Sequence, residues 1–523
     1  MHLIPKYLKG WLVVLSLLTA ACSNDDGQAP QGGNGGTEPV DGDTYGYIKD
    51  TSGSPIEGVV VSDGYTCTAT DAEGRYVLTR NADARFVFYS LPSAYEVNVD
   101  KTYKLPSFFA KLKEGTARYD FTLKALAAPE TRFDLICIGD PQINEASHAV
   151  RFKDEAGREI REYVAETDVP CYGITLGDHV NNKWALFSNM VVALQPEQTG
   201  LPVFATIGNH DHEYPTADET AARAKYESFF GPADYSFNRG DVHIVSMDNI
   251  IHSCRASADY DAGFTDEQYE WLRQDLSFVP KEKMVILCVH IPFRGGSTSG
   301  GSNVNKDKYY NEVLELLSQY EYAAIMSAHT HSNINYIHTK NGKEIFEHIT
   351  GTTCGAWWRS TVCTEGTPIG FGVYRIDGNR MDEWAYRSVR HDETFQIRLY
   401  RAGDKYTAGG DTGYYFKKRE ANQIIANVWN WDPSWTLNVY ENGTLSGQMI
   451  QSADIDAWTV AYHIGVLHNS SSYNKSTDHM FYYTLKDADA NVRVEAIDRF
   501  GNKYEQTVFA TPDSHPGEFH TDF

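Results

Sequence analysis

Between residues 129 and 390, short apolar runs alternate with segments in which apolar residues recur every three or four positions. The apolar runs cover residues 133–138, 171–176, 203–207, 242–247, 284–289 and 323–326. One helix is predicted to begin after Thr265, because Thr265 and Gln268 have the spacing of a capping box. Strands that alternate with amphipathic helices predict an α/β core for this region.

The two flanking regions consist of short runs in which apolar and polar residues alternate. In residues 44–128 these runs are separated by Gly and Pro turns, and strand-like runs return in residues 391–523. The pattern predicts a small β-sandwich at 44–128 and a β-rich domain at 391–523. Residues 54–76 resemble the carboxypeptidase-regulatory-like β-sandwich, which serves as a spacer or docking module. In the C-terminal domain, Trp429, Trp431 and Trp435 indicate either a platform for sugars or buried packing.

The N-terminus has the pattern of an export signal. Lys6 and Lys9 precede an apolar run at residues 11–21, which is too short to cross a bilayer and is typical of a secretory signal. We therefore expect residues 1–21 to be a signal peptide and residues 22–43 a polar tether. The run that ends in Cys22 resembles the lipobox of bacterial lipoproteins, in which that cysteine is acylated. The acidic residues 23–26 are similar to the export signal of Bacteroidetes surface lipoproteins.

This resemblance implies an exported outer-membrane lipoprotein, anchored to the membrane through Cys22 and facing the periplasm or the cell surface. The alternative is an ordinary signal peptide with a chance cysteine.

Composition narrows the function classes. The chain of 523 residues is 41% hydrophobic and 22% charged, which indicates several folded domains and excludes global disorder. Its 46 Lys and Arg against 70 Asp and Glu give a net charge of −24, so no nucleic-acid partner is expected. Clustered carboxylates suit divalent cations instead. The cysteines lack CxxC spacing, and the sequence leaves open whether Cys354 and Cys363 pair.

Ligand-type side chains follow directly on five of the apolar runs. In open α/β sheets, groups just beyond the carboxyl ends of strands converge on one crevice. Carboxylates and imidazoles gathered in one crevice would be costly to bury without partners, whereas divalent cations would satisfy them. The five endings are Gly139-Asp140-Pro141-Gln142, Gly177-Asp178-His179, Gly208-Asn209-His210-Asp211, Val289-His290 and His329-Thr330-His331.

This ordered series of motifs resembles the calcineurin-like metallophosphoesterase superfamily. The resemblance implies a four-layer αββα core, here flanked by two β-sandwich-like domains, and a site for two divalent metal ions. The first metal ion would be held by Asp140, Gln142, Asp178 and His331, and the second by Asp178, Asn209, His290 and His329. Family members commonly have His at the position of Gln142, and its harder amide oxygen favours manganese or iron over zinc.

The same resemblance implies a hydrolase that cleaves a small phosphomonoester or phosphodiester by attack of a metal-bound hydroxide. His210 would donate to the phosphoryl oxygen or leaving group, with Asp211 as its support. Arg294 either binds substrate phosphate or is a surface residue. Trp357 and Trp358 either stack on substrate or pack between domains. Residues 295–305 have the composition of a flexible rim.

A binding function is the alternative class. In that interpretation a cell-surface lipoprotein keeps the fold, loses a metal ion through Gln142 and captures glycans with its β domains. Metal-dependent turnover would distinguish the two.

Overall fold

The computed structural model describes residues 42–256, 259–294, 308–407, 413–414, 416–470 and 473–511. The predicted signal peptide, the lipidation site Cys22 and nearly all of the predicted tether lie outside the described residues, as does the predicted rim at 295–305. No helix among the described residues is long and apolar enough to cross a membrane. The described residues all fall within one compact unit, residues 41–523.

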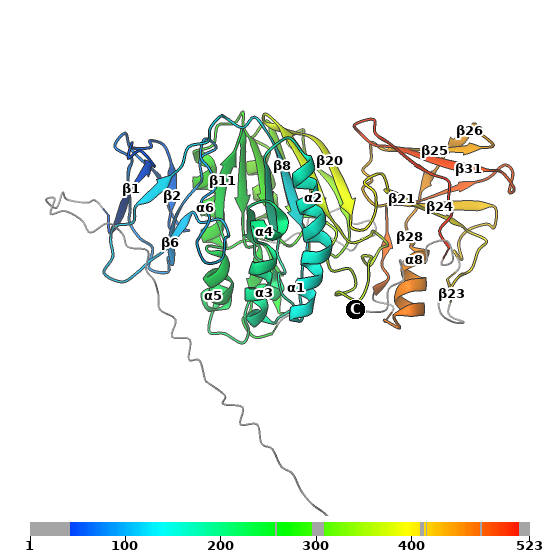
Figure 1. Cartoon of the computed structure of the whole chain (residues 1–523), viewed down its shortest axis with the longest axis horizontal. Helices are drawn as coiled ribbons and strands as arrows, with labels where there is room; N and C mark the ends of the chain where they lie inside the picture. Colours follow the sequence, from blue (N-terminus) through cyan, green and yellow to red (C-terminus); the bar gives the residue numbers. More distant parts are fainter. Residues whose placement is uncertain are drawn as a thin grey trace, which may run out of the picture. The chain divides into compact units, whose positions relative to one another are not determined.

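Two β-sheets form the centre of residues 129–390, the α/β region (Figure 1). The five-stranded sheet has the order β10 (Val203–Thr206), β9 (Cys171–Leu176), β8 (Arg132–Ile138), β19 (Gly370–Asp377), β20 (Arg380–Ser388). The six-stranded sheet has the order β11 (Tyr235–Arg239), β12 (Val242–Ser246), β15 (Met284–Cys288), β16 (Tyr322–Ser327), β18 (Lys343–Ile349), β17 (Ile334–Lys340). The strands β8, β9 and β10 are parallel, and so are β12, β15, β16 and β18. All six strands predicted in this region are present, with ends that differ by at most one residue.

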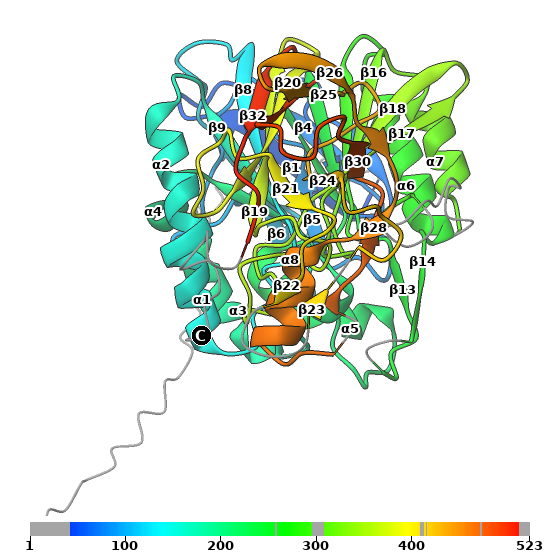
Figure 2. The same ribbon diagram turned by 90° about the vertical axis from the view of Figure 1, so that its right-hand side faces the viewer.

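Helices cover the outer faces of both sheets, and the four-layer αββα core is confirmed (Figure 2). In β8 alternate residues point to opposite sides: Leu135 and Cys137 join the core shared with the six-stranded sheet, whereas Ile136 and Ile138 pack under helices. The helices on that side are α1 (Ala146–Phe152), α2 (Arg158–Glu166), α3 (Phe187–Ala193), α4 (Pro196–Thr199) and α5 (Glu219–Phe230). Those on the other side are α6 (Asp266–Ser277) and α7 (Tyr310–Leu317).

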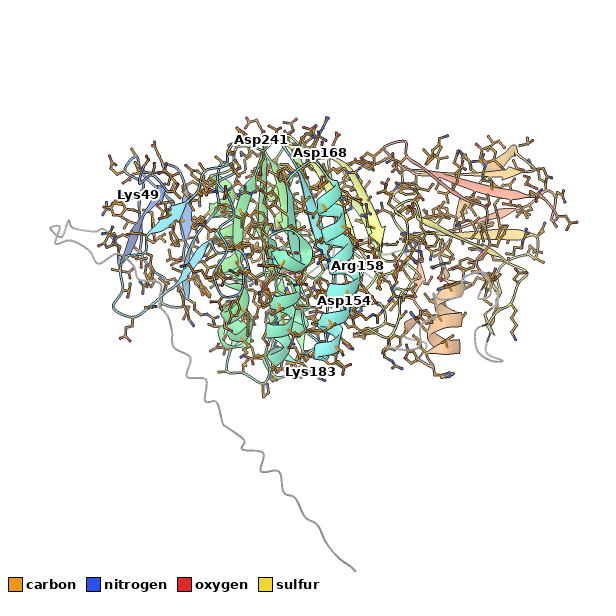
Figure 3. The ribbon with its side chains drawn as sticks, viewed as in Figure 1. Lys49, Asp154, Arg158, Asp168, Lys183 and Asp241 are labelled. Atoms are coloured by element: carbon orange, nitrogen blue, oxygen red, sulfur yellow. The ribbon has the colours of Figure 1, made fainter. Side chains whose placement is uncertain are left out.

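The helix boundaries follow from local chemistry. The predicted capping box of α6 is confirmed, because Gln268 N–H donates to Thr265 Oγ1 at 3.2 Å and Thr265 N–H donates to Gln268 Oε1 at 2.9 Å. In α2 the buried face carries Ile160, while Arg158 points to solvent beside Asp154 (Figure 3) and pairs with Glu162 at 3.0 Å. The apolar face of such a helix packs against the sheet, and its charged face lies on the opposite side, toward solvent.

The N-terminal module contains two small sheets. One has the order β4 (Arg75–Leu78), β1 (Thr44–Asp50), β7 (Phe121–Leu123), and the other β3 (Cys67–Ala69), β2 (Val60–Ser62), β5 (Phe86–Tyr89), β6 (Phe109–Lys111). The module packs against α6, where Trp271 Nε1–H donates to Ser62 Oγ at 3.0 Å and the ring of Trp271 lies 6.4 Å from that of Phe88. Its apolar residues are therefore continuous with the core of the α/β region.

The C-terminal module contains two larger sheets of four strands each. Their orders are β21 (Ile397–Arg401), β24 (Gln423–Val428), β30 (Met480–Thr484), β27 (Ile450–Gln451) and β26 (Thr444–Gln448), β25 (Thr436–Glu441), β31 (Val492–Ile497), β32 (Lys503–Gln506). The module also contains a helical segment, α8 (Ala457–Thr459), which continues as a π-helical stretch at Val460–Val466. Two-stranded sheets in this module pair β22 (Tyr406–Thr407) with β23 (Gly413–Tyr414) and β28 (Asp454–Ile455) with β29 (Ser476–Thr477), and in the α/β region β13 (Ile250–His252) pairs with β14 (Tyr260–Ala262).

The aromatic cluster of this module serves packing. Trp429 is fully buried and Trp435 is 8% exposed and stacked on Tyr504, while Trp431 packs edge-on against Phe481. The buried rings of Trp429 and Trp435 cannot present a face to a sugar, so the packing interpretation holds for these two residues, whereas Trp431 is half-buried. The seven cysteines among the described residues are free thiols, Cys354 and Cys363 included.

Candidate metal centre

Loops that follow the parallel strands bring the predicted ligands to one place. Asp140 and Gln142 follow β8, Asp178 follows β9, Asn209 follows β10, His290 follows β15, and His329 and His331 follow β16. The groups Asp178, His290, His329 and Asp140, Asp178, His331 each place their ligand atoms within 4.8 Å of one another. The structure therefore brings together the side chains that the sequence pattern selected.

The backbone of these loops is unusual. Asp140, Gln142, Asp178, His329 and His331 all have positive φ, between 37° and 63°, in the left-handed region that side chains other than glycine rarely adopt. Each such residue costs of order 1 kcal/mol or more, and such residues cluster at functional sites. Gly208 permits the close approach of two loops, because a Cβ at this position would lie 2.3 Å from Asp178 Oδ1.

Asp178 lies at the centre of the cluster and is 1% exposed. Its Oδ1 accepts from the backbone N–H of His210 at 2.8 Å, and its Oδ2 lies 3.4 Å from Gln142 Nε2 and 3.3 Å from His290 Nε2. One carboxylate oxygen thus faces both groups of ligands.

One group of ligand atoms is closely linked. Asn209 Oδ1 lies 3.0 Å from His290 Nε2 and 3.0 Å from His329 Nδ1, and the two imidazole nitrogens are 3.2 Å apart. His290 Nδ1–H donates to the carbonyl of Leu176 at 2.7 Å, which turns Nε2 toward the cluster. Metal-binding histidines are commonly oriented by this kind of bond.

The other group contains buried atoms that have no hydrogen-bond partner among the described residues. These atoms are Asp140 Oδ1, Gln142 Oε1 and His331 Nδ1. Buried polar atoms without partners are costly, and two carboxylates, an amide oxygen and an imidazole form a suitable donor set for a divalent cation. By this test the residues present fit a metal ion.

The charges of the cluster are coupled. Burial would lower the pKa of His290, but the Asp178 carboxylate outweighs it and raises this pKa to about 9. Burial would raise the pKa of Asp178, but His290 and His210 hold it well below the usual range. Burial, with the charge of His290, lowers the pKa of His329 to about 3. The Asp178 carboxylate thus favours positive charge beside it.

His210 and Asp211 occupy different positions in the same loop. His210 is partly exposed, and its Nδ1 lies 2.9 Å from Asn182 Oδ1. Asp211 is fully buried, where its Oδ2 accepts from Gly208 N–H at 3.0 Å and from His179 Nδ1–H at 2.9 Å. Asp211 therefore stabilises the loop at residues 208–211 from its buried side. The sequence pattern had given no role to His179, its buried partner.

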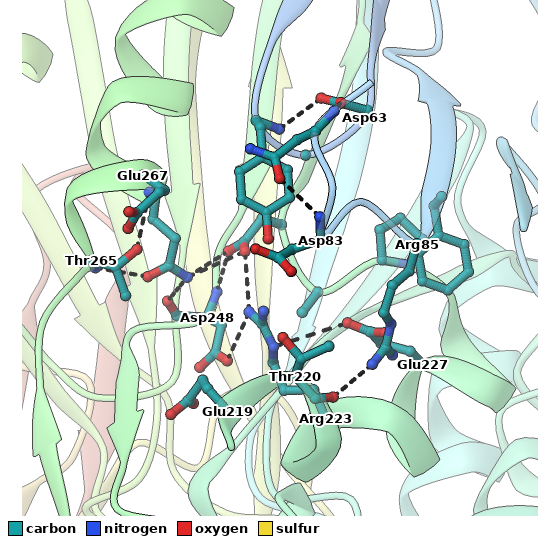
Figure 4. A pocket seen from close by; sticks show the side chains of 18 of the residues that line it. Asp63, Asp83, Arg85, Glu219, Thr220, Arg223, Glu227, Asp248, Thr265 and Glu267 are labelled. Carbon is teal, nitrogen blue, oxygen red and sulfur yellow. Dashed lines mark hydrogen bonds and ion pairs between the residues drawn. The ribbon is translucent and has the colours of Figure 1, made fainter. Parts of the chain in front are cut away.

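A charged network that the sequence pattern did not reveal supports the same loop, and Figure 4 shows its members Asp248, Arg223 and Glu219. His212 Nδ1–H donates to the carbonyl of Gly208 at 2.9 Å, and its Nε2 lies 3.0 Å from Asp248 Oδ2. Arg223 lies between Asp248 and Asp234, at 3.6 and 3.5 Å. Burial and the nearby charge of Asp248 raise the pKa of Glu219 to about 7.

The three residues predicted to contact substrate, Trp357, Trp358 and Arg294, lie in different surroundings. The ring of Trp357 is partly exposed and lies 4.8 Å from that of His331. Trp358 is 1% exposed, and its Nε1–H donates to the carbonyl of Pro141 at 2.7 Å. Trp358 supports the Asp140 loop from the protein interior, so the role of its ring is packing and not stacking on substrate. Arg294 is buried and pairs with Asp478 at 2.8 Å, and its predicted role in phosphate binding stays a prediction.

Comparison with known proteins agrees with this architecture. Family models match three consecutive parts of the chain: the N terminal of calcineurin-like phosphoesterase at residues 43–126, calcineurin-like phosphoesterase at 133–333 and the C terminal of calcineurin-like phosphoesterase at 347–504. The chain belongs to the calcineurin-like phosphoesterase superfamily.

Similar proteins include purple acid phosphatases 23 and 18 of Arabidopsis thaliana. The chain is 26% identical to the first over 180 residues and 25% identical to the second over 181 residues. These matches cover 31% and 32% of the chain, and span only 36% and 38% of the plant proteins.

Solved structures with weaker likeness include a purple acid phosphatase from yellow lupin (Lupinus luteus) seeds and a 5'-nucleotidase from Candida albicans. The lupin protein is 15% identical, with 50% of this chain and 53% of that chain covered and a TM-score of 0.36. The nucleotidase is 12% identical, with 50% and 52% covered and a TM-score of 0.31.

Proposed function

We propose that this protein is a metal-dependent phosphoesterase that hydrolyses a small phosphomonoester or phosphodiester at a site for two divalent cations. One observation carries the proposal: seven ligand-type side chains from five strand ends meet in two groups that share Asp178, and one group contains buried atoms that have no hydrogen-bond partner among the described residues. Membership of the calcineurin-like phosphoesterase superfamily supports it.

In this proposal the first cation is held by Asp140, Gln142, Asp178 and His331, and the second by Asp178, Asn209, His290 and His329. When bound, the two cations would lower the pKa of a water molecule and neutralise charge on the phosphoryl oxygens. The oxygen ligands of the first group favour manganese or iron over zinc there.

The protein's own residues would orient the substrate and move protons. Asn182 Oδ1 accepts from His210 Nδ1–H, so Nε2 can donate to a phosphoryl or leaving-group oxygen when the ring is the doubly protonated imidazolium. His210 also contacts the shared carboxylate through its backbone N–H, so that its side chain is anchored beside the cluster. Trp357 contributes a partly exposed aromatic wall next to His331.

Metal analysis together with turnover assays tests the function. We expect about two Mn²⁺ per chain and hydrolysis of p-nitrophenyl phosphate or bis(p-nitrophenyl) phosphate that a chelator abolishes and Mn²⁺ restores. Parallel assays with Fe²⁺ and Zn²⁺ would rank the metals, and the ratio of the two substrates would separate monoesterase from diesterase. A folded chain that binds no Mn²⁺, or binds it without hydrolysing either ester, would contradict the proposal.

We also propose that the protein is exported and anchored to the outer membrane through an acylated Cys22, because the sequence that precedes Cys22 resembles a lipobox. Labelling with a fatty-acid analogue in a bacterial host tests this. The full chain should take up label and Cys22→Ser should not, and equal labelling of both would refute the anchor.

A further inference from the structure

A short segment of the C-terminal module, residues 473–478, lies against the predicted metal centre. The ring of Tyr473 packs edge-on against Trp357 at 4.8 Å, and Trp357 in turn lies 4.8 Å from His331. At the other end of the segment, Asp478 pairs with Arg294 at 2.8 Å. The segment is therefore fixed to the α/β region on both sides of Lys475.

Lys475 contacts the loop that carries two of the predicted ligands. Its Nζ donates to the backbone carbonyl of Thr330 at 3.0 Å, and its own N–H donates to the carbonyl of Thr364 at 2.8 Å. Thr330 is the single residue between His329 and His331. The ammonium group thus holds the peptide that connects the two histidines.

That peptide needs external support. His329 and His331 both have left-handed backbone, with φ of 63° and 55°, and Thr330 N–H bonds to the carbonyl of Ala328 at 2.6 Å within the same loop. Residues in this region persist when the surrounding structure holds them there. The bond from Lys475 comes from a module about 145 residues further along the chain, so the loop itself does not supply it.

The geometry points to Lys475 as a positioning residue: we propose that the C-terminal module completes the metal centre by using Lys475 to fix the Thr330 peptide and thereby His329 and His331. This inference rests on the proposed function, because it assumes that the two histidines bind metal ions. Residues that orient metal ligands typically contribute 10- to 100-fold to metal affinity or activity.

The sign of the effect separates positioning from simple electrostatics. Asp140 and Glu365 lie near enough to attract the ammonium group, and a positive charge there opposes the binding of a divalent cation. If Lys475 acted only through its charge, its removal would tighten Mn²⁺ binding. If Lys475 positions the histidines, its removal weakens Mn²⁺ binding despite the loss of that repulsion.

The experiment is Mn²⁺ titration of the purified full chain by calorimetry. We compare the wild type with Lys475→Met, with Lys475→Arg, which keeps a charged donor, and with Lys503→Met as the matched control. Lys503 is 59% exposed and pairs with Glu495 within the C-terminal module. We expect Lys475→Met to weaken Mn²⁺ binding about 10- to 100-fold, Lys475→Arg to recover most of this loss and Lys503→Met to match the wild type. Saturating Mn²⁺ should then restore most of the turnover of Lys475→Met.

The inference is overturned if Lys475→Met binds Mn²⁺ as tightly as the wild type or more tightly, including the case in which only the KM for substrate rises. Thermal unfolding checks that the variants fold. If Lys475→Met does not fold, Lys475→Gln replaces it and is judged by the same criterion. A wild-type chain that binds no Mn²⁺ at all would instead refute the proposed function, which keeps the two failures distinct.

Discussion

The two halves of the metal centre are held in different ways. Around His290 the ligand atoms contact one another, since Asn209 Oδ1 lies 3.0 Å from the ring nitrogens of both His290 and His329. Around Asp140 the corresponding atoms of Asp140, Gln142 and His331 have no hydrogen-bond partner among the described residues. The half around His290 is therefore stabilised by contacts between protein groups, whereas the half around Asp140 has buried lone pairs that a cation would satisfy. Asp178 joins the two halves.

The largest effect is expected for Asp178→Asn, because this side chain faces both halves. Loss of its charge should reduce turnover by more than about 100-fold and lower the number of bound Mn²⁺ ions. Metal analysis and hydrolysis of p-nitrophenyl phosphate measure both quantities. Asp154→Asn, which changes a carboxylate that is 61% exposed, is the matched control and should behave as the wild type. Wild-type metal content and turnover in Asp178→Asn would remove Asp178 from the site.

Gln142→His tests the half around Asp140 alone. An imidazole is a stronger and softer ligand than an amide, so we expect about 10-fold tighter Zn²⁺ binding to one site and little change at the other. Competition between Zn²⁺ and Mn²⁺, followed by metal analysis, checks this. An equal change at both sites would show that the halves are not independent.

Trp358→Phe is expected to destabilise the folded protein, because Trp358 supports the loop that carries Asp140. The change leaves the carbonyl of Pro141 without the 2.7 Å bond from Nε1–H, at a cost of about 1–3 kcal/mol in the free energy of unfolding. Urea denaturation in the presence of a chelator measures this cost. Trp384→Phe is the comparison for the loss of ring volume alone, because Trp384 is a core residue of β20 that packs against Phe346 of β18.

The smallest effect concerns the network behind the His290 half. The folded-state pKa of Glu219, at about 7, lies above the ordinary value, so the folded protein binds a proton that the unfolded chain releases. Its contribution to stability is present below about pH 4.5 and is lost as the pH rises through 7. The pKa of His212 is also raised, since Asp248 and Glu219 outweigh burial, and it acts in the same direction.

Glu219→Gln should therefore match the wild type near pH 5 and exceed its stability by about 1 kcal/mol near pH 8. Thermal unfolding across this range, with chelator present, measures the difference. A constant difference at all pH values would mean that Glu219 does not titrate there.

The features that could be predicted from the sequence are those that depend on a local pattern of residues. Apolar runs located the central strands to within one residue, and the residues after them supplied the ligands, because parallel strands end at a common edge. The pattern could not reveal Lys475 or Asp248. Both act on loops far away in the sequence, and an isolated Lys or Asp has no periodicity or motif. Trp358 was visible as an aromatic residue, but whether its ring faces substrate or the interior depends on a three-dimensional contact with Pro141.

The left-handed conformation of the ligand loops has a consequence for protein engineering. Asp140, Gln142, Asp178, His329 and His331 are placed by backbone torsions that most residues avoid. Grafting these side chains onto ordinary turns of another scaffold would point them in other directions. A transplant must therefore carry the strained loops, and the rigid sheets that keep them strained, together with the amino acids.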